Sequence, residues 1–452
     1  MSNNATTYKE AAKNVFMGLL GPGGSYLSST DFWKNGNVAD TMIDYLLMAL
    51  HETDPRYRMS LSTVQGYVKQ IHDHYYATLP SDAGCWYDDF GWWGIVGAKA
   101  YDPAYASVFG PWAMEFKKIA MDNWSKMQNG KNNGRNFGAP YVWDKCDQKT
   151  YASVRPRFAG GVWQYDIFAC PVNGDCSPAD YNPATPLDVT CPKDGLSYSA
   201  VMLGPYQLSV VNGLYLVLAT RLAKAGIAGM DQHAKDVYSF ISNWCNVEKA
   251  ADKSLLYRFN TTGKEYGLIR ERVSVYANGS GVKFYKPDNV WCGDQGLFIG
   301  GLLDYAATFN HPTALILALK VTIGVYSQMQ VMPTTDPLPV SIIAPYMPYS
   351  GYHLPFSGDT DDYASGLGVF MRYLYYSYQQ NSNIKELVDG WEYREAIRNA
   401  ANAACRDTIP KADVAIFAAL NRLATLMMGI VMGMNGEAAV PGTAAENIEN
   451  AG

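Results

Sequence analysis

The sequence predicts an all-helical fold in which buried helices alternate with helices that face solvent on one side. Residues 88–101 and 295–308 are apolar on nearly every side, whereas residues 111–127 and 232–246 are apolar along one stripe. A helix that is apolar all round is buried, and a helix with one apolar stripe lies at the surface. The alternation therefore predicts an inner and an outer ring of helices. An irregular helical bundle is the alternative.

The predicted helices follow one another from residue 38 to residue 434, with the longest gap over residues 128–205. Two of the links between them carry recognisable signals: Asp54-Pro55 reads as a turn, and Asp102-Pro103 reads as an N-cap followed by proline at the first helical position. Helices are predicted over residues 38–50, 60–77, 88–101, 111–127, 206–222, 232–246, 295–308, 313–329, 363–380, 392–406 and 411–434.

Glycines in the buried helices support the two-ring interpretation. A glycine inside a helix costs helix propensity, and close packing between neighbouring helices can offset that cost. The glycines in question are Gly91, Gly94, Gly97, Gly296, Gly300 and Gly301.

The longest segment without helical periodicity covers residues 128–205 and is rich in Gly, Pro, Asn and Asp. A loop of that length inside a domain usually serves the function of the protein. Residues 160–165 could form a short strand within it. Nothing divides residues 1–435 into two folding units, so we expect one domain. Residues 436–452 contain few bulky apolar side chains and are expected to be a disordered tail.

Composition excludes several classes of partner. The 452 residues carry a formal net charge of −6, which argues against nucleic acid and anionic membranes as partners, since both need a basic face. Apolar runs such as 423–434 are too short to span a bilayer. The 33 tyrosines and 11 tryptophans suit sugar rings as well as an ordinary core. The N-terminus shows no signal peptide, and the eight cysteines lack the spacing of a zinc site.

Two neighbouring acids, Asp88 and Asp89, open a predicted buried helix between aromatic side chains. Glycoside hydrolysis commonly uses two carboxyl groups, and a separation of about 5 Å implies retention of configuration. Neighbouring side chains on a helix point about 100° apart, so two aspartates can span that distance. The helix N-terminus should favour the ionised form of one acid. Aromatic burial and the neighbouring charge should raise the pKa of the other. Helix capping is the alternative role for this pair.

The sequence around this pair resembles a known family. Tyr87-Asp88-Asp89-Phe90-Gly91-Trp92-Trp93 is similar to the Asp-Asp-Glu-Gly-Trp-Trp motif of glycoside hydrolase family 76, the endo-α-1,6-mannanases. Five further blocks resemble family elements in the same order, and together the blocks cover roughly residues 30–380. They are Phe32-Trp33-Lys34-Asn35-Gly36-Asn37, Gly160-Gly161-Val162-Trp163, Asn212-Gly213-Leu214-Tyr215-Leu216, Asp294-Gln295-Gly296-Leu297-Phe298-Ile299-Gly300-Gly301-Leu302 and Gly368-Val369-Phe370-Met371-Arg372-Tyr373-Leu374.

The resemblance implies an (α/α)₆ barrel with long loops at one face. It also implies a retaining mechanism without metal or cofactor, with Asp88 as nucleophile and Asp89 as acid/base. The expected partner is an oligo- or polysaccharide, the expected state a monomer, and a secreted or periplasmic location is favoured. The chain departs from the family at Phe90, where an acidic or polar residue is usual, and at Cys292-Gly293-Asp294, where the family has Tyr-Asn before the glutamine. Both departures bear on substrate and linkage more than on the fold.

Further side chains are candidates for binding the sugar. Aromatic rings could stack on sugar faces, and polar groups at helix starts could bind sugar hydroxyls, although core packing and helix capping are the alternatives. The candidates are Tyr87, Trp92, Trp93, Trp163, Asp294, Gln295, Asp361 and Asp362.

Three other functions are compatible with parts of the sequence. The same two acids would serve a transglycosidase if a sugar replaced water. A glycan-binding protein without catalysis could use the same barrel. An isoprenoid cyclase could bind Mg²⁺ through Asp359, Asp361 and Asp362, but that reading leaves Asp88, Asp89 and the ordered family blocks unexplained.

Overall fold

The computed structural model describes most of the helical part of the chain and several short strands. The described residues are 7–20, 32–79, 86–129, 141–144, 149–152, 161–164, 187–190, 197–203, 207–246, 254–261, 264–271, 274–278, 281–285, 290–331, 342–343, 365–406 and 415–434.

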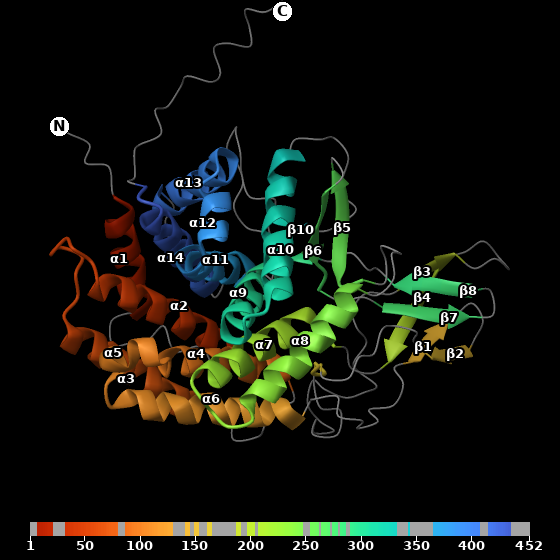
Figure 1. Ribbon diagram of the computed structural model, residues 1–452, viewed down its shortest axis with the longest axis horizontal. Coiled ribbons are helices and arrows are strands. Elements are labelled where there is room, and N and C mark those ends of the chain that lie inside the picture. Colours follow the sequence, from red (N-terminus) through yellow and green to blue (C-terminus); the bar gives the residue numbers. More distant parts are fainter. Residues whose placement is uncertain are drawn as a thin grey trace, which may run out of the picture.

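An inner ring of helices forms the centre of the fold, and each of its helices contacts the next until the ring closes (Figure 1). Their sequences are largely buried, as the all-round apolar pattern predicts. Within the described residues the ring consists of α2 (Phe32–Leu50), α4 (Tyr87–Ala100), α7 (Ser209–Lys224), α9 (Cys292–Phe309), α11 (Gly366–Gln380) and α14 (Ala415–Val431).

A second layer of helices packs around this ring. Helix α1 (Tyr8–Leu20) and helix α13 (Trp391–Arg406) lie against α14, and α3 (Leu61–Thr78) lies against α2. Helices α6 (Trp112–Asn129), α8 (Met230–Asn246) and α10 (Pro312–Val331) cover α4, α7 and α9 in turn. The predicted (α/α)₆ barrel is therefore confirmed. Short helices fill the links: η2 (Pro103–Tyr105), α5 (Ala106–Phe109) and α12 (Ser382–Val388).

Strands outside the barrel qualify the all-helical prediction. Strands β1 (Tyr141–Asp144), β2 (Lys149–Ala152), β3 (Leu187–Thr190) and β4 (Ser197–Leu203) form an antiparallel sheet in the order β2-β1-β4-β3. With β7 (Ser274–Asn278) and β8 (Gly281–Tyr285) they lie to one side of the helices (Figure 1). The predicted strand at 160–165 is not among them: within the described residues 161–164, only an isolated bridge at residue 162 is present.

The remaining strands form pairs. Strands β5 (Leu256–Thr261) and β6 (Lys264–Ile269) are an antiparallel hairpin with Leu256 opposite Ile269, and β6 contacts α10. Strands β7 (Ser274–Asn278) and β8 (Gly281–Tyr285) form a second hairpin. Strands β9 (Val290–Trp291) and β10 (Ile342–Ile343) pair in parallel just before α9. Short strand pairs of this kind carry little hydrophobic periodicity, which is why the helical pattern dominated the sequence.

The inner helices all point the same way, so the barrel has two different mouths. At one end, Trp291 at the start of α9 meets Trp92 near the start of α4 in an edge contact at 6.4 Å. At the other end, Lys99 of α4 pairs with Asp44 of α2 near both C-termini. We name these ends the N-terminal mouth and the C-terminal mouth. The positive ends of the helix dipoles therefore converge on the N-terminal mouth.

Close approach of two helix backbones explains Gly97 of the inner helix α4. A Cβ atom placed on Gly97 of α4 would lie 2.6 Å from the backbone nitrogen of Ala120 and 2.6 Å from the carbonyl oxygen of Phe116 in α6. Backbone atoms cannot move aside as a flexible side chain can. The packing that the sequence predicted for the glycines of the buried helices is therefore present at Gly97.

We expect Gly97→Ala to lower the free energy of unfolding by about 1–3 kcal/mol, because the methyl group overpacks the α4–α6 contact. Gly66→Ala in α3 is the matched control, since no atom lies within 4 Å of its added Cβ. The free energy of unfolding of Gly66→Ala should rise by about 0.5–1 kcal/mol, because alanine favours the helix more than glycine does. Urea unfolding of both variants measures the two changes in the free energy of unfolding. Equal changes would contradict the close contact between α4 and α6 at Gly97.

Among the residues that the structure describes, every helix is too short or too polar to span a bilayer.

Candidate active site

Asp88 and Asp89 lie in the first turn of α4, at the N-terminal mouth of the barrel. The residue before the helix, Trp86, is the N-cap and makes no capping hydrogen bond with its side chain. Both aspartates are partly exposed, whereas Tyr87 and Phe90 on either side are buried. Negative charge is stabilised at a helix N-terminus. Two carboxyl groups therefore share one helix end with favourable electrostatics.

The start of α4 is held by the segment 161–164, which overlaps the family block Gly160-Gly161-Val162-Trp163. The backbone N–H of Tyr87 donates to the carbonyl oxygen of Gln164 at 2.9 Å. The backbone N–H of Val162 donates to Oδ1 of Asn212 at 2.7 Å, and Nδ2 of Asn212 donates to the carbonyl oxygen of Val162 at 3.1 Å. Nδ2 also donates to the carbonyl oxygen of Leu208 at 2.7 Å. The amide of Asn212 in α7 thus holds the segment 161–164, and this segment in turn holds the start of α4.

Asn212 belongs to one of the family blocks but is not among the predicted site residues. Its signal in the sequence is a single amide inside a helix that is apolar all round. A buried polar group needs hydrogen-bond partners, and Asn212 finds them in an extended segment 50 residues away along the chain. It is a positioning residue rather than a residue that touches substrate.

Replacing Asn212 by Ala should lower the free energy of unfolding by about 1–3 kcal/mol, since the buried N–H and carbonyl of Val162 lose their partner. Asn243→Ala on the exposed face of α8 is the control, because its amide makes only a 3.4 Å contact with Ser239. Guanidinium unfolding compares the two. If Asn212→Ala lowers the free energy of unfolding no more than Asn243→Ala does, the hydrogen bonds between Asn212 and Val162 contribute nothing to stability.

Gln295 repeats this arrangement on the next inner helix. Its Oε1 accepts from the backbone N–H of Ile269 at 2.8 Å, and its Nε2 donates to the carbonyl oxygens of Ile269 at 2.8 Å and Trp291 at 3.0 Å. The side chain is completely buried. The predicted sugar contact of Gln295 is therefore corrected: its amide clamps the end of β6 to α9.

The residues after β6 are also attached to α7. The backbone N–H of Ser209 donates to the carbonyl oxygen of Glu271 at 3.0 Å, and its hydroxyl donates to the carbonyl oxygen of Arg270. Arg270 and Glu271 are both buried. The chain from 269 to 271 is thereby fixed between the starts of two inner helices, and sequence periodicity gave no sign of it.

Trp93 belongs to the core and not to a sugar site. Its exposed fraction is 0%, and its indole N–H donates to the carbonyl oxygen of Phe32 at 2.8 Å. The ring packs against Phe32 and Tyr75 at centroid distances of 5.8 and 5.1 Å. The prediction that Trp93 stacks on a sugar is corrected, because no face of its ring is open.

The other predicted aromatic residues lie closer to the mouth but are also well covered. Trp92 is 2% exposed, and Trp163 and Tyr87 are each 3% exposed. Trp92 lies against the edge of Trp291, which is itself the N-cap of α9. Stacking of Tyr87, Trp92 and Trp163 on a sugar stays a prediction.

Two further predictions concern acidic side chains. Asp294 lies in the first turn of α9 and is fully buried there. Its contact with sugar hydroxyls stays a prediction. Asp361 and Asp362, together with Asp359, lie outside the residues that the structure describes. Within the described part of the chain, no group of three acidic, histidine or cysteine side chains could hold a metal ion.

A network of buried charges runs along the barrel axis below the site. Asp40 of α2 contacts Nζ of Lys99 at 2.5 Å and Nε of Arg372 at 2.6 Å. Burial by itself raises the pKa of Asp40, but the two cations outweigh it, and the pKa lies below its ordinary value. Lys99 also contacts Asp44 at 2.8 Å. Burial keeps the pKa of Asp44 above its ordinary value despite this contact.

Arg372 connects this network to α4, the helix that begins with Asp88 and Asp89. Its Nη2 donates to Oδ1 of Asn37 at 3.0 Å, and its guanidinium lies 5.6 Å from the ring centroid of Trp92. Trp92 is one helical turn beyond Asp88 on α4. Arg372, which belongs to the last family block, therefore packs under the residues of the N-terminal mouth and contacts both α2 and α4.

Comparison with known proteins identifies the fold. No protein-family model matches the sequence, and no curated protein matches it. Among solved structures, the α-1,6-mannanase GH76A of Salegentibacter sp. HEL1_6 has a TM-score of 0.53 at 12% identity, covering 94% of this chain and 99% of that one. A family 76 mannosidase of Bacteroides thetaiotaomicron VPI-5482 has a TM-score of 0.51 at 11% identity, with 94% and 99% covered.

A third solved structure has the same architecture. Dfg5 from Chaetomium thermophilum, solved in complex with glucosamine, has a TM-score of 0.51 at 11% identity, with 94% of this chain and 90% of that one covered. At such identities the likeness establishes the fold alone. The resemblance to glycoside hydrolase family 76 that the sequence predicted is confirmed at that level.

Proposed function

We propose that this chain is a retaining glycoside hydrolase of the family 76 type that cleaves an α-1,6-linked mannan. The observation that carries the proposal is the pair Asp88 and Asp89 in the first turn of an inner helix, at the mouth where the helix N-termini converge. In the Salegentibacter mannanase, an inactive variant with two consecutive aspartates replaced by asparagine was solved in complex with α-1,6-mannotriose. The correspondence of two consecutive aspartates on one fold supports the same chemistry here.

In this mechanism Asp88 attacks the anomeric carbon while Asp89 donates its proton to the departing glycosidic oxygen. A covalent glycosyl ester on Asp88 results. Asp89, now ionised, removes a proton from the incoming water, which displaces Asp88 from the anomeric carbon. Two displacements at one carbon retain its configuration. The dipole of α4 favours the ionised form of Asp88 before the attack.

The positions of the two acids fit this division of work. Consecutive Cα atoms are about 3.8 Å apart and their side chains diverge by about 100° around a helix, so carboxyl separations of about 5 Å are accessible. A neutral polysaccharide also needs no basic surface, in keeping with the net charge of −6.

A panel of mannans incubated with the wild-type protein and with Asp88→Asn tests the proposal, with product masses as the readout. We expect the wild type to shorten α-1,6-mannan and Asp88→Asn to leave it intact. Asp231→Asn on the exposed start of α8 is the control and should cleave normally. Products longer than the substrate would indicate transfer to a sugar in place of water. A wild-type protein that leaves every mannan intact, or an Asp88→Asn variant that still cleaves, would end the proposal.

A further inference from the structure

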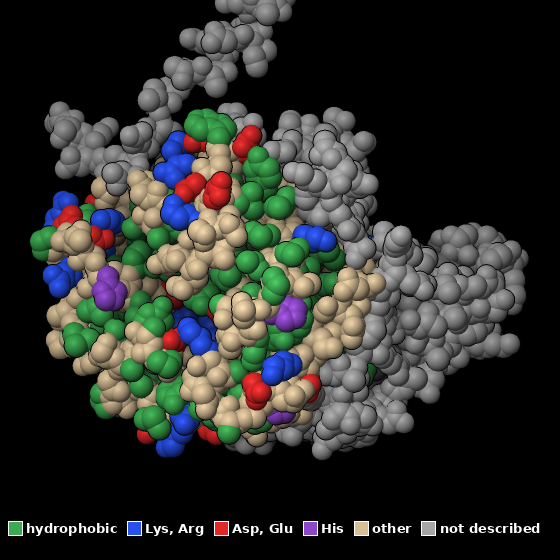
Figure 2. All heavy atoms as spheres, in the orientation of Figure 1, with side chains coloured by type: hydrophobic (Ala, Val, Ile, Leu, Met, Phe, Trp, Pro, Cys, Tyr) green, Lys and Arg blue, Asp and Glu red, His purple; other side chains and the backbone are tan. Residues whose placement is uncertain are grey.

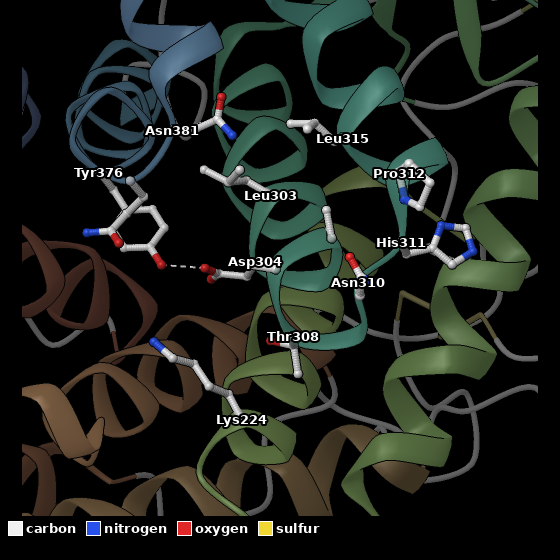
Figure 3. A pocket seen from close by; sticks show the side chains of 13 residues that line it. Lys224, Leu303, Asp304, Thr308, Asn310, His311, Pro312, Leu315, Tyr376 and Asn381 are labelled. Atoms are coloured by element: carbon white, nitrogen blue, oxygen red, sulfur yellow. Dashed lines mark hydrogen bonds between the residues drawn. The ribbon is translucent and has the colours of Figure 1, made fainter.

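The C-terminal mouth of the barrel contains a groove that the proposed reaction does not use. It consists of two adjoining cavities with volumes of about 660 and 320 Å³, which share Tyr376 and Gln380 as lining residues. The larger cavity lies among the ends of α7, α9 and α11 and the starts of α10 and α12 (Figure 3). The smaller one lies among the ends of α2, α11 and α14. Small-molecule sites commonly have volumes of about 300–1,000 Å³.

The floor of the groove is neutral because its charges are paired. Asp304 accepts from Nε of Arg221 at 2.9 Å and from the hydroxyl of Tyr376 (Figure 3). Burial, followed by the nearby Asp304, raises the pKa of Tyr376, which therefore stays a hydroxyl at neutral pH. These pairs also hold the floor in place before any ligand binds, which reduces the cost of binding.

The charges at the sides of the groove are paired in the same way. Lys224 contacts Asp102 at 2.9 Å, and Glu52 contacts Lys9 at 2.9 Å. On the face seen in Figure 2, charged side chains of both signs are scattered among uncharged ones. The converging helix C-termini carry the negative ends of the dipoles, which disfavours an anion. The carboxylates of the lining are each already paired with a cation, so a neutral ligand fits the groove best; they are Asp44, Glu52 and Asp304.

The uncharged lining has the hydrogen-bonding character of a sugar site. Thr308, Asn310, Gln380 and Asn381 contribute one hydroxyl and three amides. An amide both donates and accepts, as a sugar hydroxyl does. Oδ1 of Asn381 accepts from the backbone N–H groups of residues 383 and 384, which fixes the orientation of that amide. Ring surface comes from tyrosines: Tyr105 and Tyr375 line the smaller cavity and Tyr376 lines both.

We propose that this groove is a second glycan-binding site, which holds a short neutral oligosaccharide on the face of the barrel opposite Asp88 and Asp89. The inference rests on the groove and not on the proposed catalysis. Calorimetric titration with α-1,6-mannotriose tests it in the Asp88→Asn/Asp89→Asn background, where the probe cannot be consumed. We expect two binding sites per chain: one in the groove, and one at the N-terminal mouth, which alone rests on the proposed function.

Substitutions in the groove assign the second site. Ala307→Trp places a large ring in the larger cavity from an exposed position of α9, and Gln380→Ala removes the amide that both cavities share. Each should abolish one of the two sites or weaken it at least tenfold. Gln70→Trp, on the exposed face of α3, is the matched control and should keep both.

The outcomes separate this inference from the proposed function. The second site is overturned if mannotriose binding is the same in Ala307→Trp and Gln380→Ala as in their parent. It is also overturned if the parent has a single binding site and both substitutions leave that site intact. Binding that Ala307→Trp removes supports it, even if the wild-type protein cleaves no mannan, in which case only the catalytic proposal fails.

Discussion

Asp89→Asn is expected to slow the cleavage of α-1,6-mannan by about 10²–10⁴-fold, the usual contribution of a positioned general acid. The departing oxygen of a sugar is a poor leaving group unless it is protonated as the bond breaks. Asn has the size of Asp but no acidic proton to give. Initial rates of mannan cleavage by the wild type and Asp89→Asn, at equal protein concentration, measure the loss.

The leaving group of the substrate then separates the roles of the two acids. An aryl α-mannoside with an acidic phenol needs no proton on departure, so formation of the glycosyl ester should be largely restored in Asp89→Asn. Asp88→Asn lacks the nucleophile and should not recover with either substrate. Equal losses with mannan and aryl mannoside in Asp89→Asn would contradict the assignment of that residue as acid. Recovery in Asp88→Asn would mean that the two roles are exchanged.

Asp40→Asn is expected to lower the free energy of unfolding by about 3–5 kcal/mol, the cost of breaking a buried ion pair by removing one partner. Asp40 is fully buried and contacts both Lys99 and Arg372. Without its charge, Arg372 loses the carboxylate that it contacts, while Lys99 keeps its contact with Asp44. A whole domain is stable by about 5–15 kcal/mol, so this loss is a large share of the total. Denaturant unfolding at neutral pH measures it.

The dependence of this effect on pH gives an independent check. The pKa of Asp40 is lower in the folded protein than in the unfolded chain. Its contribution to stability is therefore present above the unfolded pKa, and it is lost as the pH falls through the folded pKa. The difference between wild type and Asp40→Asn should narrow in strong acid. Asp231→Asn is the control: its pair with Lys235 is exposed, at 3.5 Å, and should contribute less than about 1 kcal/mol at any pH.

The order and burial of the helices could be predicted because they depend on local periodicity. Residues 88–101 and 295–308 are apolar all round and became parts of α4 and α9 in the inner ring. Residues 232–246 carry one apolar stripe and became part of α8 in the outer layer. Each pattern can be read within a few helical turns, since a helix buries whichever face is apolar.

The roles of individual side chains at the N-terminal mouth could not be predicted in the same way. Trp92 and Trp93 are neighbours in one motif, yet Trp93 packs in the core while Trp92 lies between Trp291 and Arg372. Gln295 looked like a ligand for sugar and is instead a clamp on Ile269. Neighbouring residues on a helix point in different directions, and only the packed neighbours decide which direction leads to the mouth.

The sequence by itself determined that this chain is helical, that its helices form two layers, and that two acids open one of the buried helices. The tertiary structure decided which end of the barrel those acids occupy and what holds them there. Asn212 reaches Val162 across 50 residues, and Arg372 reaches Asn37 across 335. Such contacts have no local signature, because a hydrogen bond across the barrel depends on where the chain returns and not on the residues beside it.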